Sequence, residues 1–145
     1  MPGVEAPILV TGLEPGPLDV AALVQAIRRP DCGGVVVFEG TVRAQSEGRM
    51  VLRLEYEAYE SRALAQLRAL AEEVVERFAL GGAVAVHRVG VVDVCEPAVV
   101  VAAAAAHRGE AFTAAQELID RTKAEVAIWK KEVFAQGHAS WVGVT

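Results

Sequence analysis

Lysine is scarce in this 145-residue sequence, which has three lysines against eleven arginines. All three, Lys123, Lys130 and Lys131, fall within nine consecutive residues. An ammonium group can lose its proton when it is buried, whereas a guanidinium stays charged, so this segment favours proton-transfer or nucleophilic chemistry at a lysine. The alternative explanation is a helix C-terminus that attracts cations.

The sequence also lacks the excess of basic residues that a nucleic-acid-binding protein needs. Its formal net charge is −5, which argues against general binding to nucleic acid or to an anionic membrane but allows a local basic pocket. The longest apolar run, Ala98–Ala106, is too short to span a bilayer, and no signal peptide opens the chain.

Cysteine is rare, and several common catalytic motifs are missing. Cys32 and Cys95 form neither a Cys-X-X-Cys motif nor a His/Cys spacing suited to zinc. We interpret both as reduced thiols in the core of a cytoplasmic protein. The sequence has no P-loop, Gly-X-Gly-X-X-Gly, nucleophile elbow or His-Glu-X-X-His, so nucleotide-dependent and zinc-hydrolase functions lack their usual residues. We expect no metal site and no resident cofactor.

The length and composition predict one globular domain. Hydrophobic residues make up 53 % of the chain and charged residues 23 %, enough to build a core without disulfides. We therefore predict a single domain over residues 1–145. Residues 1–7 hold two of the six prolines and show no periodicity, so we expect them to form a flexible arm.

Hydrophobic periodicity predicts an alternation of hairpins and helices. We expect helices over residues 19–29, 61–78 and 108–125, and strands over 8–11, 35–43, 51–59, 84–94, 99–106, 127–134 and 139–144. Gly40 is expected to mark a bulge, and Gly81–Gly82 to close the second helix. This order favours an α+β fold of mostly antiparallel strands over a doubly wound parallel sheet.

The helix over 108–125 carries two candidate site features. Lys123 falls just outside the edge of its apolar arc, where a side chain can line a cleft while its stem is buried. The arc consists of Ala111, Ala115, Leu118, Ile119 and Thr122. His107 and Arg108 stand at the helix N-terminus, where a phosphate or carboxylate ligand would offset the unfavourable position of a cation. Alternatively, Glu110 pairs with Arg108 and His107 caps the helix or lies in the core.

Two further groups of cations allow a functional or a structural interpretation. Arg43 ends a strand beside a polar loop, where it either clamps an anion at a cleft mouth or is an ordinary solvated residue. His87 and Arg88 lie within a predicted strand, so their side chains point to opposite faces. We predict a structural role for this pair.

The remaining candidates are carboxylates and tryptophans. Glu55 and Glu57 share one face of a strand by its period of two. They could perform acid–base chemistry, but a solvated outer face is the simpler interpretation. Trp129 and Trp141 are most simply anchors of the core or of an interface.

Five sequence blocks occur in a telling order: F-E-G-T-V-R (38–43), L-E-Y-E-A-Y (54–59), H-R-V-G (87–90), H-R-G-E-A-F (107–112) and K-A-E-V-A-I-W-K-K-E (123–132). Over roughly residues 33–142 the chain thereby resembles the large, catalytic subunit family of molybdopterin synthase. The sequence departs from this pattern in three places: Ala127 stands where relatives usually have a proline, Cys95–Glu96–Pro97 replaces the usual Gly-acidic turn, and many relatives have a longer C-terminal tail with a basic residue.

The resemblance implies an α/β hammerhead-type fold and a homodimer. It also implies a small ubiquitin-like sulfur-carrier subunit at each end, which makes a heterotetramer. The carrier's C-terminal Gly-Gly thiocarboxylate would enter the pocket and deliver sulfur to cyclic pyranopterin monophosphate. Two such transfers would build the dithiolene of molybdopterin, a step of molybdenum cofactor biosynthesis.

Carried over to this sequence, the family's site falls on eight residues. The resemblance implies catalysis by Lys123 and Lys130, which would hold the thiocarboxylate, stabilise negative charge and exchange protons. The implied substrate-binding residues are Arg43, His107 and Arg108, with Phe38, Lys131 and Glu132 close by. The nucleophilic sulfur comes from the carrier, so neither cysteine is needed for catalysis.

Two other functions remain open from the residues alone. A non-catalytic module could hold a phosphorylated small molecule or a carrier's C-terminal peptide in the same basic cleft, and its binding would survive Lys→Arg changes. A lysine enzyme could form a Schiff base with a carbonyl substrate, which borohydride would trap.

Overall fold

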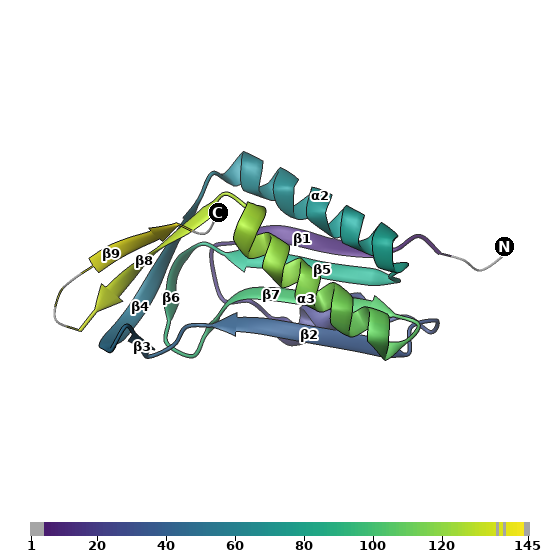
Figure 1. Ribbon diagram of the computed structural model, residues 1–145, viewed down its shortest axis with the longest axis horizontal. Coiled ribbons are helices and arrows are strands. Elements are labelled where there is room, and N and C mark those ends of the chain that lie inside the picture. Colours follow the sequence, from purple (N-terminus) through teal and green to yellow (C-terminus); the bar gives the residue numbers. More distant parts are fainter. Residues whose placement is uncertain (1–4, 136, 138, 144–145) are drawn as a thin grey trace.

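A computed structural model describes residues 5–135, 137 and 139–143. These residues form three helices and nine strands arranged in two sheets (Figure 1), so the predicted α+β class is confirmed. Of the arm predicted over residues 1–7, residues 1–4 lie outside the described part of the chain. Residues 5–7 are exposed and form neither helix nor strand.

The first sheet has the strand order β1-β5-β7-β2. Its strands are β1 (Ile8–Glu14), β5 (Gly82–Arg88), β7 (Pro97–Ala105) and β2 (Gly34–Thr41). β1 pairs with β5 in parallel, and the other two pairs are antiparallel. The central strands β5 and β7 consist largely of valine and alanine and are buried on both faces.

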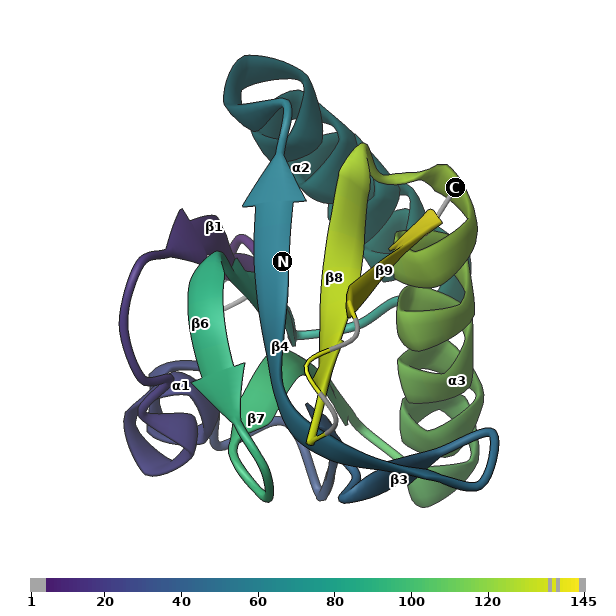
Figure 2. The same cartoon turned by 90° about the vertical axis from the view of Figure 1, so that its left-hand side faces the viewer.

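Helices cover both faces of this sheet. α2 (Glu60–Phe78) and α3 (Arg108–Glu125) pack on one face (Figure 1), and α1 (Val20–Ala26), labelled in Figure 2, packs on the other. The alternation along β7 separates the two cores, since Val101 and Ala103 face α2 and α3 while Val100 and Ala102 face α1. Among the described residues, no helix has the length and apolar character needed to cross a membrane.

The second sheet is antiparallel and stands across one end of the first (Figures 1 and 2). Its long strand β4 (Arg49–Ala58) pairs with β6 (Gly90–Asp93) on one side and with β8 (Ile128–Phe134) on the other. β9 (Ala139–Gly143) continues the sheet beyond β8, and β3 (Gln45–Ser46) forms a hairpin with β4. The two sheets enclose a corner beside the C-terminal end of α3.

Several predicted element boundaries are wrong, among them the end of β2, which is Thr41 instead of residue 43. The strand expected over 84–94 is two strands, because Val89 and Gly90, the latter with a φ of +90°, turn the chain from the first sheet into the second. β1 runs to Glu14 instead of ending at residue 11, since its ladder with β5 continues through Gly12 and Leu13. α1 ends at Ala26 instead of Arg29.

Two predictions about special residues are also wrong. Ala79, with a φ of 53°, caps α2 in the left-handed conformation, and the glycine pair lies beyond this cap. Cys95 is exposed in the β6–β7 turn, so it is not a core thiol, whereas Cys32 is half-buried; both are free. The last predicted strand is confirmed as far as Gly143, and Val144 lies outside the described residues.

Candidate functional site

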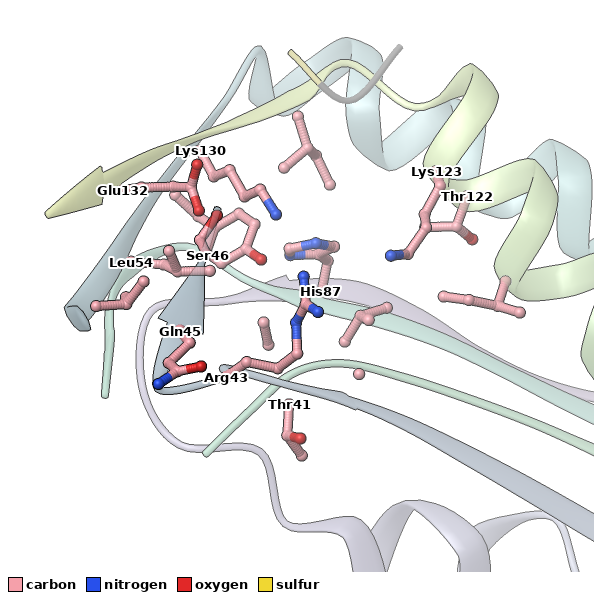
Figure 3. Close-up of a pocket in the computed structure, with 17 residues that line it drawn as sticks. Thr41, Arg43, Gln45, Ser46, Leu54, His87, Thr122, Lys123, Lys130 and Glu132 are labelled. Atoms are coloured by element: carbon pink, nitrogen blue, oxygen red, sulfur yellow. The ribbon is translucent and has the colours of Figure 1, made fainter. Parts of the chain in front are cut away.

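A cavity of about 160 Å³ lies at the corner between the two sheets and α3. Figure 3 shows its lining, in which Arg43, Lys123 and Lys130 direct their cationic ends inward. Glu132 is the one carboxylate in this lining. The cavity therefore collects cations from three separate parts of a chain whose net charge is negative.

Lys130 reaches the cavity from β8, where it lies directly across from Tyr56 of β4. Burial lowers the pKa of its half-buried ammonium below the usual 10.5. Glu132 partly opposes this effect, and the neighbouring Lys123 and Arg43 add to it. Lys130 thus gives up its proton more easily than an exposed lysine does.

Lys131 points to the opposite, outer face of the second sheet. Its Nζ lies 3.5 Å from Glu55 Oε1 and 5.5 Å from the ring centroid of Trp141. Glu57 on the same face accepts a hydrogen bond of 3.3 Å from the indole of Trp129. The outer-face interpretation of the two glutamates is therefore confirmed, and Lys131 does not line the cavity. Trp141 is 54 % exposed and so is not a core anchor.

Lys123 enters from the last turn of α3. The five residues of the predicted apolar arc are all buried, which confirms Lys123 at the arc's edge. Two of them, Ile119 and Thr122, line the cavity beside Lys123. Thr122 donates its hydroxyl proton to the carbonyl of Leu118 at 2.7 Å, so it offers no free donor to a ligand.

Arg43 is held at the cavity mouth by the β6–β7 turn. Val42, which is buried, accepts from the amide of Cys95 at 2.8 Å and donates to the carbonyl of Glu96 at 3.1 Å. The carboxylate of Glu96 in turn accepts a 3.1 Å hydrogen bond from the largely buried Arg88. Arg88 thus has the structural role that was predicted for it, behind the segment between β2 and β3 that carries Arg43.

Gly40 confirms the predicted bulge. The β2–β7 register shifts between Gly40 and Thr41, and both residues line the cavity. A Cβ atom at Gly40 would lie 2.6 Å from Cγ1 of Val99 and 3.5 Å from the ring of Phe38. Phe38 therefore lies on the same face of β2 as the cavity, although it does not line the cavity itself.

His87 is the site residue that the sequence analysis missed. Its side chain is buried in the cavity wall, where it meets Tyr56 edge-to-face at a centroid distance of 4.8 Å. Burial lowers the pKa of this imidazole to about 4; a hydrogen bond to the Arg88 carbonyl opposes the shift, and Lys123 and Lys130 reinforce it. The signal available in the sequence was the period of two, which puts His87 on the same face of the sheet as Ala83 and Ala85, the face covered by α2 and α3.

His107 and Arg108 do not reach the cavity of their own chain. Arg108 begins α3 and Lys123 lies in its last turn, so the two are separated by roughly 22 Å along the helix axis. His107 occupies the N-cap position of α3, as one alternative predicted, but it is exposed and its side chain makes no cap hydrogen bond. Among the described residues, Arg108 forms no ion pair with Glu110.

Ala127, which stands where relatives usually have a proline, is held by two hydrogen bonds of its backbone. Its backbone amide donates a 2.7 Å hydrogen bond to Oε1 of Gln66 on α2, which a proline could not do. Its carbonyl accepts from the amide of Tyr59 at 3.1 Å. The start of β8, and hence the direction of Lys130, is fixed by these bonds.

The arrangement is suited to anions. Three cationic side chains surround the space, and neither Lys123 nor Lys130 forms an ion pair within the described residues. Anywhere in the described residues, no group of three or more His, Cys, Asp or Glu side chains is arranged to hold a metal ion. The cavity can therefore bind a carboxylate or phosphate directly through lysine and arginine and supply protons from an ammonium of lowered pKa.

Comparisons with known proteins agree with one another. Residues 13–125 match the family model described as MoaE protein. The chain is 40 % identical over 132 residues to a molybdopterin synthase catalytic subunit of Thermoplasma volcanium, covering 91 % of this chain and 94 % of the relative. It is 37 % identical over 127 residues to the protein of the same name from Bacillus subtilis, covering 88 % and 80 %.

Solved structures give the same result. The chain resembles the crystal structure of molybdopterin synthase from Staphylococcus aureus with a TM-score of 0.83 and 32 % identity, over 91 % of this chain and 96 % of that one. A complex of subunits 1 and 2 of molybdopterin-converting factor from Helicobacter pylori matches with a TM-score of 0.71 at 18 % identity, over 93 % and 90 % of the two chains, which supports the fold alone.

Proposed function

Since the chain belongs to the MoaE protein family and is a catalytic subunit of molybdopterin synthase, we propose that sulfur transfer takes place in the cavity of Arg43, Lys123 and Lys130. The observation that carries this proposal is the convergence of two lysines from α3 and β8 on one space. Each is free of ion pairs within the described residues, so their positive charge remains available to a ligand.

The donor and acceptor that the family implies are both anions. A small ubiquitin-like carrier subunit would present a C-terminal Gly-Gly thiocarboxylate, and cyclic pyranopterin monophosphate carries a phosphate. Each transfer replaces the sulfur on the carrier's carboxyl carbon by an oxygen from water, so protons must move during the reaction. The cavity has three cations and one carboxylate, so it can bind both anions at once with little electrostatic repulsion between them.

Lys123 and Lys130 differ in their surroundings, so we assign them different roles. Lys130 has a pKa lowered by burial, so it releases its proton more easily than an exposed lysine and suits a group that donates and accepts protons. Lys123, at the end of α3, is placed to hold the thiocarboxylate and to stabilise the negative charge that develops on it. Arg43 at the mouth binds the substrate phosphate through its guanidinium.

The remaining predicted residues fit an assembly of two copies with a carrier at each end, a heterotetramer in the cytoplasm. His107 and Arg108 would serve the cavity of the second copy, because they are too far from their own. Phe38 would border the bound substrate, and Glu132 would tune Lys130. Lys131, on the outer face, would hold the carrier's tail instead of the substrate.

Reconstitution tests this assignment. The protein is mixed with thiocarboxylated carrier and the cyclic precursor, and molybdopterin formation is measured. Lys123→Ala and Lys130→Ala should each lower kcat by about 100-fold or more. Lys131→Ala should raise the KM for the carrier and leave kcat unchanged. Arg68→Ala, in an exposed ion pair on α2, is the matched surface control. Full activity in both cavity variants would overturn the assignment.

Lys→Arg variants separate catalysis from simple binding. Arginine keeps the charge but cannot donate its proton near neutral pH. We expect Lys130→Arg to retain binding of the precursor and to lose turnover. Turnover equal to that of the wild-type protein would show that charge alone suffices and would argue against proton transfer by Lys130.

A further inference from the structure

His87 has no part in the proposed function, yet it lies at the centre of the site. In Figure 3 its imidazole lies between the side-chain ends of Lys123 and Lys130. Its Nδ1 is 2.7 Å from the carbonyl oxygen of Arg88. A carbonyl can only accept a hydrogen bond, so Nδ1 carries the proton and the neutral ring has its lone pair on Nε2.

The Nε2 atom has no hydrogen-bond partner among the described residues. The side chain is 5 % exposed, and the ring is fixed by its Nδ1 hydrogen bond and by its edge-to-face contact with Tyr56. The backbone of β5 and a tyrosine of β4 thus present an acceptor to the cavity in one orientation. The cationic donors that share the cavity with this acceptor are the two ammonium groups and Arg43.

We propose that His87 is a positioning residue whose Nε2 accepts a hydrogen bond from the ammonium of Lys123 or Lys130 and so holds these groups where the sulfur is transferred. The inference rests on the proposed function of the cavity. It assigns to the His of the H-R-V-G segment a specific task, which is to orient a catalytic ammonium without removing its charge.

The charge environment explains why a histidine serves here. Lys123 faces the ring from α3, Lys130 and Glu132 face it from β8, and Arg43 faces it from the end of β2. A carboxylate in this position would neutralise an ammonium that the anionic substrates need, and a second cation would repel it. The imidazole, whose pKa is lowered to about 4, stays neutral at physiological pH and offers a lone pair only.

Two amide substitutions separate this role from a structural one. In His87→Gln the amide stands at the position of Nε2 and can still accept from an ammonium. In His87→Asn the amide stands at the position of Nδ1, so it can still donate to the Arg88 carbonyl but leaves the cavity without an acceptor. A role in packing or in holding β5 predicts that the Asn variant is the better tolerated of the two.

The first measurement is an NMR titration of the lysine side chains. The chain has only three lysines, so NMR titration of lysine side chains labelled with ¹³C and ¹⁵N gives three sets of signals. We expect His87→Asn to lower the pKa of Lys123 or Lys130 by about one pH unit, because the charged form loses an acceptor. His87→Gln should leave both near their wild-type values. Lys131, on the outer face, should titrate identically in all three proteins.

The second measurement is activity. His87→Asn should lower kcat by about tenfold or more with little change in the KM for the precursor, and His87→Gln should restore most of kcat. A failure of the wild-type protein to make molybdopterin would count against the proposed function. An active wild type whose lysine titrations and kcat are the same in both variants would overturn the inference alone.

The wild-type protein also provides a test that needs no variant. ¹⁵N labelling of its three histidines should show His87 as the neutral form protonated at Nδ1. Its Nε2 resonance should shift as Lys123 or Lys130 titrates. A ring protonated at Nε2, or an Nε2 signal that ignores both lysines, would overturn the inference even if the variants did not fold.

Discussion

His87 couples the stability of the whole chain to pH. Its pKa is lowered from 6.5 to about 4 by burial above all, so between these values the unfolded chain binds a proton that the folded protein does not. The free energy of unfolding therefore falls as the pH drops through this window. We expect a loss of about 2 kcal/mol between pH 7 and about pH 4.5 from this residue, measured by urea unfolding.

The variant His87→Gln supplies the control for this prediction. It cannot titrate, so its free energy of unfolding should lack this part of the pH dependence. Carboxylates such as Glu55, whose pKa is lowered chiefly by its hydrogen bond from Arg53, lose their contribution only as the pH falls through their still lower folded pKa values. Identical slopes for both proteins between pH 6.5 and 5 would contradict the assignment to His87.

At the level of single residues, the sequence predicted cations better than it predicted their neutral neighbour. Lys123, Lys130, Arg43 and Glu132 line one cavity. The scarcity of lysine and the helical geometry had indicated the two lysines, Arg43 was a candidate anion clamp, and Glu132 was implied by the family resemblance. His87 looked structural, since a lone histidine in a buried strand carries no signal of its own. Its role depends on charges contributed by α3 and β8, which only the fold brings together.

Gly40 lets β2 pass close to Val99 of β7 at the wall of the cavity. A Cβ there would lie 2.6 Å from Cγ1 of Val99, a branched side chain with little freedom to move away. We expect Gly40→Ala to lower the free energy of unfolding by about 1–3 kcal/mol through overpacking. Urea unfolding with an unchanged m-value would measure this, and molybdopterin synthesis should fall as well because both residues line the cavity.

Gly12 provides a matched glycine for comparison. It also lies in a strand of the first sheet, but a Cβ at its position meets nothing within 4 Å. Gly12→Ala should therefore change the free energy of unfolding by no more than about 0.5 kcal/mol. If both alanine variants behaved alike, the close packing at Gly40 could not be the cause of its effect.

Elements were predictable where the local pattern alone decides them. The helix over 108–125 has the predicted bounds, because its apolar arc is regular and ends beside the lysine. The strand over 84–94 was predicted whole because valines continue on both sides of Gly90, although glycine is depleted in strands and here has a φ of +90°. Its break reflects a change of pairing partner, from β7 to β4, and no local signal encodes that.

At the scale of the whole molecule, the position of the cavity explains both what was predicted and what was not. Residues from β2, β4, β5, β7, α3 and β8 meet only because the second sheet stands across the end of the first (Figure 2). No pattern in the sequence indicates that the two sheets cross in this way. The predicted helix over 108–125 already put His107–Arg108 and Lys123 at opposite ends. Which of these ends borders the cavity depends on the crossing of the sheets.

The separation within α3 leads to a prediction about assembly. If two copies associate and each lends His107 and Arg108 to the other's cavity, Lys123→Ala and Arg108→Ala inactivate different parts of one composite site. A heterodimer of these two inactive variants then contains one site with both changes and one site with neither. Such heterodimers, isolated through two different affinity tags, should recover about half of the wild-type activity.

A second pair of variants makes the result specific. Lys123 and Lys130 line the same cavity of one chain, so a heterodimer of Lys123→Ala and Lys130→Ala has a defect in each of its sites and should remain inactive. If Arg108 acted only within its own chain, the first pair would be equally inactive. Recovery in the first pair alone therefore requires that α3 of one copy end in one active site and begin in the other.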